Sequence, residues 1–256
     1  PEATAYTRKL ATDAVNTLSA NGAQVTVLVN SDPEHLEQDL EAVVVPGLIA
    51  IVLPKVEEAQ ELAALSTMLE AIEYERGMER LAIKVITVIE SPRALERIRE
   101  IADGPRLIGI SIGCSGVLSV IGISLGSEDF SLSLGRPPTA LSLGYAAQTI
   151  SYAASARGLM GLAMASGIGN FTNLEGFGAA AVHAHAMGLT GAMCIHPSQV
   201  PVLNECFGVS QAEIADARAI VAAWETRQDG VVSHNGRMID QPVAERARRL
   251  LTSAER

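Results

Sequence analysis

Two carboxylates stand where apolar segments of the sequence end. Glu90 follows the run "VITVI" (85–89), and Asp129 lies in "GISLGSEDFSLSLG" (122–135), after a strand-like segment and within a polar, glycine-bounded stretch that reads as a loop. Acids at the ends of neighbouring strands would form a site of hard oxygen ligands. Mg²⁺ prefers one or two carboxylates together with water and substrate oxygens, whereas Zn²⁺ would require His or Cys, which lie near neither acid in the sequence. The pattern therefore favours a magnesium site.

Each acid also has an ordinary structural interpretation, as a helix N-cap or an ion-pair partner. For a single Glu that interpretation would be preferred, but two acids in matching positions without a neighbouring basic residue favour the metal. Lys55 follows a proline at another predicted strand end. It could bring a positive charge to the substrate or to an enolate oxygen, or it could pair with Glu57 or Glu58, and the sequence leaves both alternatives open.

Three other features carry weaker signals. His196, in "CIHPSQ", closes the last predicted strand and is best explained as a hydrogen-bonded structural imidazole held by the Pro197 turn. His183 and His185 are two positions apart on a predicted helix and face different sides, so they are not expected to bind a metal together. The glycine-rich stretch 167–173 could let the backbone approach a ligand.

The elements that must position these residues alternate along the chain. Helices are expected at 4–20, 33–44, 57–75, 92–102, 139–156 and 174–187, and strands at 24–30, 47–56, 82–90, 106–113, 159–165 and 191–197. The region from about 198 on is expected to be helical, with a helix at 210–226 followed by the polar turn 228–236. Strands that are apolar on both faces and separated by amphipathic helices imply a parallel sheet between helices.

Polar residues recur at the carboxyl ends of these strands, namely Asn30, Lys55, Glu90, Asp129 and His196. Because a (β/α)₈ barrel builds its active site from that edge, we predict an α/β enzyme with a TIM-barrel fold. Residues 1–200 are expected to form the barrel and residues 201–256 a C-terminal helical extension.

Only about six of the eight strands of such a barrel can be found, and the chain begins in a predicted helix. We therefore expect the natural protein to carry roughly 40 to 60 further N-terminal residues that supply the missing βα units. The near-repeat of "GISIG" (109–113) and "GISLG" (122–126) leaves open which copy is the barrel strand, and residues 111–123 look inserted.

Several classes of function are disfavoured. A net charge of −10 argues against a nucleic-acid partner. The segment "VNSDPEH" (29–35) lacks the glycines of a dinucleotide-binding turn, and no Walker A sequence occurs. Cys114, Cys194 and Cys206 have neither disulfide nor zinc spacing and are interpreted as buried residues in a reducing compartment. With no secretory segment and no apolar run of about 18 residues, we expect a soluble cytoplasmic protein without membrane contact.

The chain resembles the HpcH/HpaI aldolase and citrate lyase β-subunit family, particularly its acyl-CoA lyase branch. The matching segments are "LPKVEEAQEL" (53–62), "VIESPRALERIREIA" (88–102), "LGSEDFSLSLG" (125–135), "AHAMGLTGAMCIHPSQVPVLNECF" (184–207) and "GRMIDQPVAERARRLL" (236–251). The resemblance implies a magnesium-dependent (β/α)₈ barrel in which Glu90 and Asp129 are the metal ligands.

The activity implied by the resemblance is cleavage of a 3-hydroxyacyl-CoA thioester, of citramalyl-CoA or malyl-CoA type, to acetyl-CoA and a 2-oxo acid. An alternative in the same family is a citrate lyase β subunit acting on a carrier-bound citryl thioester. A non-catalytic barrel that only binds a ligand is the alternative from another class. Its main support is Leu28, which stands in "VLVN" where the family usually has an Arg that contacts the substrate. The family's acidic "DLED" motif would fall in the missing N-terminal segment.

Asp240, in "MIDQP", has a local and a family interpretation. Locally it is an N-cap for the helix that begins near Pro242. The resemblance implies instead that it completes the active site of a neighbouring subunit as an acid or base. We therefore expect a homo-oligomer, a trimer or hexamer, with Asp240 and Lys55 as catalytic residues.

Overall fold

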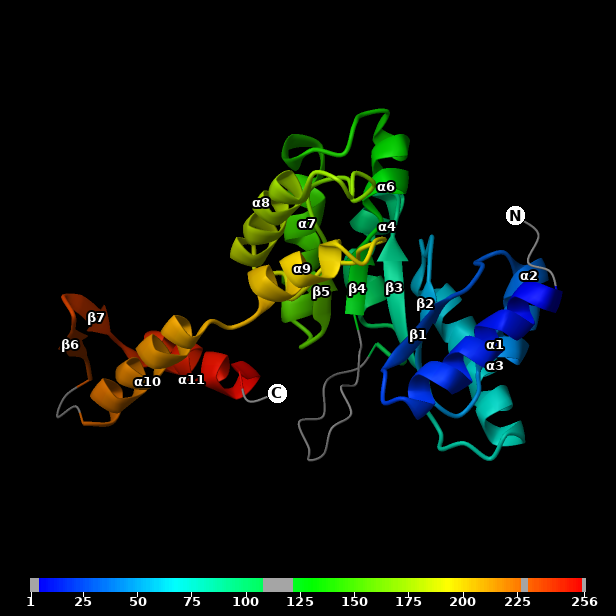
Figure 1. Cartoon of the computed structure of the whole chain (residues 1–256), viewed down its shortest axis with the longest axis horizontal. Coiled ribbons are helices and arrows are strands. Elements are labelled where there is room, and N and C mark those ends of the chain that lie inside the picture. The colour runs from blue at the N-terminus through cyan, green and yellow to red at the C-terminus, as the bar shows by residue number, and fades with distance from the viewer. Residues whose placement is uncertain (1–4, 108–121, 227–229, 255–256) are drawn as a thin grey trace. The chain divides into compact units, whose positions relative to one another are not determined.

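The computed structural model describes residues 5–107, 122–226 and 230–254. Its centre is a five-stranded parallel sheet in the order β1-β2-β3-β4-β5 (Figure 1). The strands are β1 (Val25–Leu28), β2 (Leu48–Leu53), β3 (Lys84–Ile89), β4 (Gly122–Leu125) and β5 (Met160–Leu162). A parallel bridge adds Gly191 beside Leu162 at the β5 edge. The predicted parallel α/β architecture is therefore confirmed.

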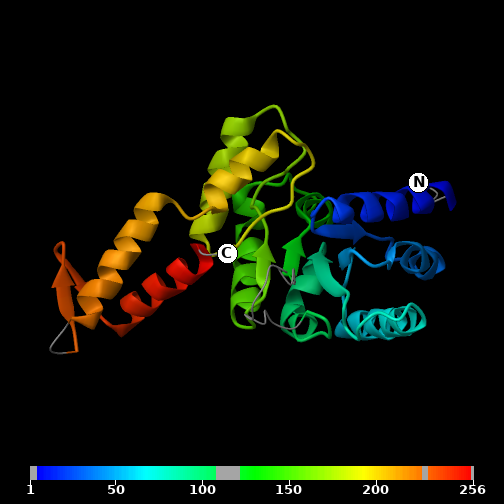
Figure 2. The same ribbon diagram turned by 60° about the horizontal axis from the view of Figure 1, so that its bottom comes forward.

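Helices connect the strands and cover the sheet (Figure 2). They are α1 (Ala5–Ala20), α2 (Pro33–Val43), α3 (Ala59–Glu75), α4 (Pro92–Glu96), α5 (Ile98–Ala102), α6 (Ser127–Leu134), α7 (Ala140–Ser155), α8 (Leu174–Ala186) and α9 (Gln199–Phe207). Helix α3 shows why they form, since it buries apolar side chains at helical spacing, from Leu62 and Leu65 to Leu69 and Ile72. No helix among the described residues is long and apolar enough to cross a membrane.

The alternation of side chains along strand β3 shows where the Glu90 side chain leaves the core. Val52, Ile86, Val88 and Leu162 form one buried cluster, so they share a face of the sheet. Glu90 lies two residues beyond Val88, and side chains two apart in a strand point to the same side. The carboxylate therefore leaves the apolar core at the carboxyl edge of the sheet.

The chain divides into two compact units, Pro1–Leu203 and Asn204–Arg256. The second unit contains α10 (Gln211–Glu225), β6 (Val232–His234), β7 (Arg237–Ile239) and α11 (Gln241–Ala254). Trp224, Ile239 and Ala244 form its buried cluster. The two helices expected in this region are confirmed as α10 and α11, but the strands β6 and β7 were not expected.

The two short strands of the second unit form an antiparallel hairpin around Asn235 and Gly236. Both residues have positive φ, 49° and 73°, as a type I′ turn requires. Asn-Gly between two strands is the strongest short-range signal for such a hairpin.

Three expected elements differ in the structure. The helix expected at 92–102 is two short helices that meet at Arg97. The strand expected at 191–197 is reduced to the single bridging residue Gly191. The strand expected at 106–113 falls mostly on residues outside the described part of the chain, as does the first "GISIG" copy with Cys114 and most of the segment 111–123. Strand β4 belongs to the second copy, "GISLG".

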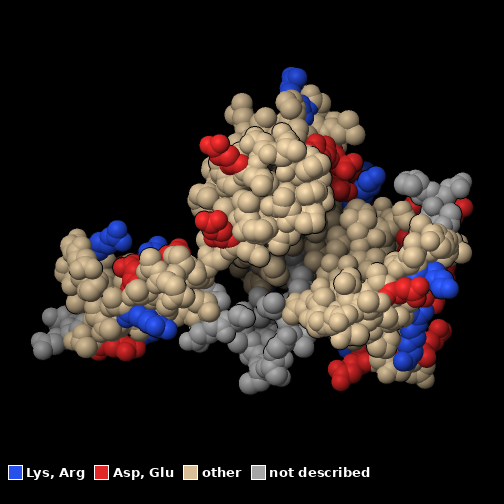
Figure 3. All heavy atoms as spheres, viewed as in Figure 1, with Lys and Arg blue, Asp and Glu red and all other residues tan. Residues whose placement is uncertain are grey.

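Charged side chains are distributed over the surface without a single dominant patch on the face shown in Figure 3. Among the described residues, Lys and Arg side chains on that face lie interspersed with Asp and Glu.

Candidate metal centre and substrate chamber

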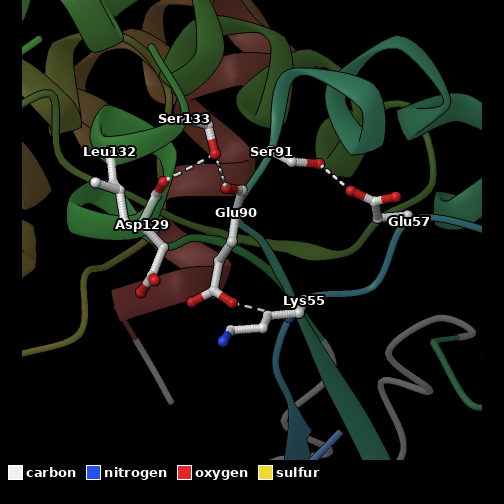
Figure 4. Close-up of a pocket in the computed structure, with 7 residues that line it drawn as sticks. All are labelled: Lys55, Glu57, Glu90, Ser91, Asp129, Leu132 and Ser133. Atoms are coloured by element: carbon white, nitrogen blue, oxygen red, sulfur yellow. Dashed lines mark hydrogen bonds between the residues drawn. The ribbon is translucent and has the colours of Figure 1, made fainter. Parts of the chain in front are cut away.

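The two acids singled out in the sequence lie together at the carboxyl edge of the sheet. Glu90 directly follows β3, Asp129 lies just beyond β4, and the two strands are paired neighbours. Both acids line a cavity of about 210 Å³, here called the carboxylate cavity. Figure 4 shows their carboxylates pointing to the same side, with the Lys55 side chain beside Glu90. Glu57, Ser91, Leu132 and Ser133 complete the lining.

Asp129 is held by a helix, although its segment was expected to be a loop. It lies in the first turn of α6, which begins after Gly126 and ends at Gly135. Gly135 has φ of 62°, the left-handed conformation that commonly ends a helix. Because a helix N-terminus carries a partial positive charge, it stabilises the carboxylates of Glu128 and Asp129 in that first turn.

Gly126 allows the Glu90 carboxylate to lie against the β4–α6 turn. A Cβ at this position would be 2.4 Å from Cγ and 2.5 Å from Oε1 of Glu90. The Gly126 N–H also donates to the carbonyl oxygen of Ile89, at 2.9 Å, which fixes the turn beside β3. Gly126 thus positions Glu90, a role that sequence reasoning missed although the glycine stands immediately before the "SED" segment.

Lys55 contacts the site through its backbone as well as its side chain. Its N–H donates to Oε2 of Glu90 at 2.9 Å. Lys55 has φ of 58°, an unfavourable left-handed conformation for a residue with a side chain, and such strain is concentrated at functional sites. No basic residue adjoins either acid in the sequence, but the fold places Lys55 beside Glu90.

The acids proposed as structural partners of Lys55 bind arginines instead. Glu58 pairs with Arg93 at 2.9 Å and with Arg97. Glu57 lies 3.4 Å from Arg93 Nε and accepts a hydrogen bond of 2.7 Å from the Ser91 hydroxyl. Neither Glu57 nor Glu58 therefore forms the ion pair with Lys55 that was the alternative interpretation of this lysine.

The electrostatics of Glu90 suit a cation. Burial raises the pKa of Glu90, the neighbouring Asp129 carboxylate raises it further, and the N–H and charge of Lys55 only partly oppose these effects. Two adjacent carboxylates resist ionising together, and a divalent cation would relieve that repulsion.

The donor set fits Mg²⁺ better than zinc. Within the described residues, no group of three or more His, Cys, Asp or Glu side chains could hold a metal. Glu90 and Asp129 would supply two carboxylates and leave the remaining positions to water and substrate oxygens, the arrangement that Mg²⁺ favours.

A larger apolar cavity adjoins the two acids. This cavity of about 350 Å³, here called the chamber, is also lined by Glu90 and Asp129. Its apolar wall includes Leu28, Val88, Leu125, Leu162, Met164, Ile168, Met193 and Ile195. None of the described residues that line it is Lys or Arg. Hydrocarbon groups beside the carboxylates would be accommodated there.

Other predicted residues have structural partners. The His196 ring stacks on Phe171, with centroids 4.5 Å apart, and its Nδ1 lies 2.8 Å from the Ser198 hydroxyl, in agreement with a structural imidazole. The Asn30 side chain donates to Asp39 at 2.7 Å. Cys194 and Cys206 are both half-buried, so the expectation of buried cysteines is wrong for these two, and Cys194 lines the chamber.

Part of the glycine-rich stretch 167–173 borders a third cavity. Its residues Gly167, Gly169, Asn170 and Asn173 line a space of about 380 Å³ together with Glu128. This stretch therefore lies between the two cavities, since Ile168 faces the chamber.

Asp240 belongs to the second unit and caps a helix there. Its Oδ1 accepts a hydrogen bond from the Val243 N–H at 3.1 Å, in the first turn of α11. Asp240 therefore caps α11, as its local interpretation predicts. This contact does not conflict with the role in a neighbouring subunit that the resemblance implies.

Comparisons with known proteins agree on one family. Residues 1–197 match the family model described as HpcH/HpaI aldolase/citrate lyase. The chain is 34% identical over 236 residues to citrate lyase subunit beta of Escherichia coli (strain K12), covering 91% of this chain and 74% of that protein. It is 28% identical over 214 residues to the L-malyl-CoA/beta-methylmalyl-CoA lyase of Rhodobacter capsulatus, covering 80% and 67% of the respective chains.

Solved structures show the same fold. A citrate lyase from Burkholderia xenovorans LB400 superposes with a TM-score of 0.76 at 20% identity, covering 98% of this chain and 80% of that one. The CitE protein of Mycobacterium tuberculosis, in complex with magnesium, acetoacetate and coenzyme A, superposes with a TM-score of 0.68 at 26% identity, covering 95% and 84%.

Proposed function

The chain belongs to the HpcH/HpaI aldolase/citrate lyase family, and from this premise we propose a magnesium-dependent lyase that cleaves a 3-hydroxyacyl-CoA thioester to acetyl-CoA and a 2-oxo acid. The observation that carries the proposal is the pair of carboxylates, Glu90 and Asp129, at adjacent strand ends beside Lys55. In this proposal residues 1–200 are the larger part of a (β/α)₈ barrel and residues 201–256 a C-terminal extension. The relative crystallised with magnesium and coenzyme A supports the choice of metal and of thioester.

Each part of the site has a task in the cleavage. Glu90 and Asp129 would hold Mg²⁺, which supplies Lewis-acid polarisation of the substrate's oxygens when bound. Lys55 places a positive charge beside the carboxylate cavity, where it stabilises negative charge that develops on the thioester enolate. A base must take the hydroxyl proton as the C–C bond breaks. With substrate bound, the apolar wall of the chamber would shield the enolate from water until it is protonated.

The chamber favours a substrate of citramalyl-CoA or malyl-CoA type over one with an additional carboxylate. Leu28 is 64% exposed and lines the chamber on its β1 side. An apolar side chain there gives no ion-pair partner to a further carboxylate, so a methyl group or hydrogen is the better fit.

A second candidate function is cleavage of a citryl thioester on a carrier protein. The 34% identity to the E. coli citrate lyase subunit favours this candidate.

A panel of thioesters tests this function. The purified natural protein, supplied with Mg²⁺, should release acetyl-CoA and a 2-oxo acid from citramalyl-CoA or malyl-CoA, and chelation by EDTA should stop the reaction. Mass spectrometry of both products makes the assignment. Cleavage of a carrier-bound citryl thioester alone would favour the second candidate. Absence of magnesium-dependent cleavage from every thioester would reject a lyase and leave a non-catalytic binding protein.

We also propose that the protein is a homo-oligomer, most simply a trimer, in which Asp240 assists proton transfer at a neighbouring chain's site. Asp240→Asn and Glu90→Gln subunits should each be inactive alone, whereas mixed oligomers should recover part of the activity, because some sites then contain both native residues. Native mass spectrometry verifies the mixing and kinetics measures the recovery. An active monomer, or verified mixed oligomers without activity, would reject the shared site.

A further inference from the structure

One buried amide joins two segments of the first unit. Gln199, the first residue of α9, is 0% exposed. Its Oε1 accepts hydrogen bonds from the N–H groups of Ile195, at 3.0 Å, and His196, at 3.2 Å. Its Nε2 donates to the carbonyl oxygen of Ile168 at 2.9 Å, across 31 positions of sequence. Removing such a side chain would leave three backbone groups without these partners.

The two joined segments form part of the chamber wall. Ile168 and Ile195 both line the cavity that contains Glu90 and Asp129. The segments that carry Ile168 and Ile195 pair as in a sheet only near their starts. Toward the wall residues, the last backbone hydrogen bond of this pairing in the described part of the chain runs from the Ala163 N–H to the Gly191 carbonyl oxygen, at 3.2 Å. The wall residues lie beyond that point, so the sheet ladder does not fix them.

Two contacts nearer the surface connect the same segments. Phe171 stacks on His196 with an angle of 11° between the rings. The Ser198 hydroxyl donates to the Phe171 carbonyl oxygen at 3.4 Å. Phe171 is 43% exposed, so the stack is open to solvent and Gln199 is the buried member of this set of contacts.

The geometry assigns Gln199 as a positioning residue, which sets the apolar wall of Ile168 and Ile195 and thereby determines how tightly the acyl portion of the substrate is held. It acts through these two residues rather than on the reacting atoms. The kinetic consequence rests on the proposed lyase function, because the chamber holds an acyl group only if a thioester is cleaved beside it. The structural consequence, a fixed spacing of the two segments, does not depend on the lyase function.

The variant Gln199→Glu tests the assignment through its pH dependence. A protonated carboxyl group has the size of the amide and can donate to Ile168 while accepting from Ile195 and His196. The ionised group would direct a negative oxygen at the Ile168 carbonyl oxygen. Burial raises the pKa of the introduced carboxyl group, so the defect should grow as the pH rises through that pKa. We expect KM for the thioester to rise about tenfold at high pH, the size expected for a lost buried hydrogen bond, with a smaller change in kcat.

Hydrogen exchange supplies a readout that is independent of activity. Repulsion between the ionised carboxylate and the Ile168 carbonyl oxygen should displace the side chain from its buried position, which also removes the acceptor of the Ile195 and His196 N–H groups. Relative to the unaltered chain at the same pH, the variant should therefore exchange these two backbone amides faster at high pH and at a nearly native rate at low pH. Gln148→Glu is the matched control. Gln148 also donates to a backbone carbonyl, that of Met187 at 3.0 Å, but lines neither the chamber nor the carboxylate cavity. It should change neither KM nor the exchange of Ile195.

The outcomes separate the two proposals. Native exchange at Ile195 and His196 together with native KM in Gln199→Glu would overturn the assignment. A loss of folded protein that lowers kcat equally for all thioesters, with KM unchanged, would reduce Gln199 to a purely structural residue and also overturn it. If the variant unfolds at neutral pH, lowering the pH should refold it, because protonation restores the donor to the Ile168 carbonyl oxygen, and failure to refold at any pH at which the unaltered chain is folded counts against the assignment. Absence of turnover in the unaltered chain would reject the lyase alone, since exchange still tests the wall.

Discussion

We expect Glu90→Gln and Asp129→Asn each to abolish magnesium-dependent cleavage while the protein stays folded. Each change replaces a charged ligand by a neutral amide oxygen, and kcat/KM should fall by more than about 100-fold, the upper range for residues that only support metal ligands. The fold should survive, because a Gln at position 90 can still accept the hydrogen bond from Lys55, and Asp129 is exposed on α6. Calorimetric titration with Mg²⁺, kinetics and circular dichroism measure binding, activity and folding.

Glu57→Gln is the matched control for these variants. Glu57 lines the same carboxylate cavity, but Ser91 and Arg93 bind its carboxylate. Neutralising it should leave Mg²⁺ affinity within about threefold of the native value, in keeping with the small contribution of an exposed ion pair. Full activity of Glu90→Gln or Asp129→Asn at ordinary magnesium would exclude these residues as the ligands.

The position of Glu90 at the end of β3 could be predicted, because the apolar pattern of the strand alone shows where the strand ends. The run 85–89 is buried along its whole length, and the acid follows directly. The helix around Asp129 was not predicted because a polar stretch bounded by glycines is also typical of a loop, whereas here Gly126 and Gly135 lie at the two ends of the helix. The Asn-Gly dipeptide at 235–236 indicates a hairpin, but the polar turn predicted at 228–236 did not include the two short strands that flank it.

The contacts that refine the site could not be derived from local pattern. The 2.9 Å bond from Lys55 to Glu90 spans 35 positions and depends on a left-handed backbone conformation that no sequence rule assigns to a lysine. The place of Gly126 depends on the path of the Glu90 side chain. Gln199 joins backbone groups that are adjacent only after the sheet has formed. Such contacts follow from the fold rather than from the residues that precede or follow them.

Glu73→Gln should destabilise the protein by about 3 to 5 kcal/mol, the largest stability effect that we expect from one substitution. Glu73 forms a bidentate ion pair with Arg106, at 2.8 and 2.9 Å, and neither side chain is more than 1% exposed. Glu73 also accepts the N–H groups of Leu81 and Ile83. The substitution would leave a buried guanidinium without its counter-charge.

Chemical denaturation measures this effect, with an exposed ion pair as the control. Asp103 binds Arg157 through two hydrogen bonds of 2.5 and 2.7 Å, but its side chain is 66% exposed. Asp103→Asn should therefore lower the free energy of unfolding by less than about 1 kcal/mol. The double variant Glu73→Leu/Arg106→Met removes both buried charges and should be more stable than Glu73→Gln. Equal losses from Glu73→Gln and Asp103→Asn would contradict the account.

The same ion pair predicts a pH dependence. Burial opposes ionisation of Glu73, but the hydrogen bond from Arg106, the Ile83 N–H and the Arg106 charge outweigh it, so the pKa of Glu73 lies below its ordinary value. A carboxyl group with a lowered pKa in the folded state contributes stability that is present above its unfolded pKa, about 4.3, and is lost as the pH falls through its folded pKa. The stability difference between the native chain and Glu73→Gln should thus be constant near neutral pH and shrink in acid. At about pH 2 Glu73 is protonated in the unfolded native chain. If the stability difference between the native chain and Glu73→Gln is the same there as at neutral pH, the charge of Glu73 does not stabilise the fold.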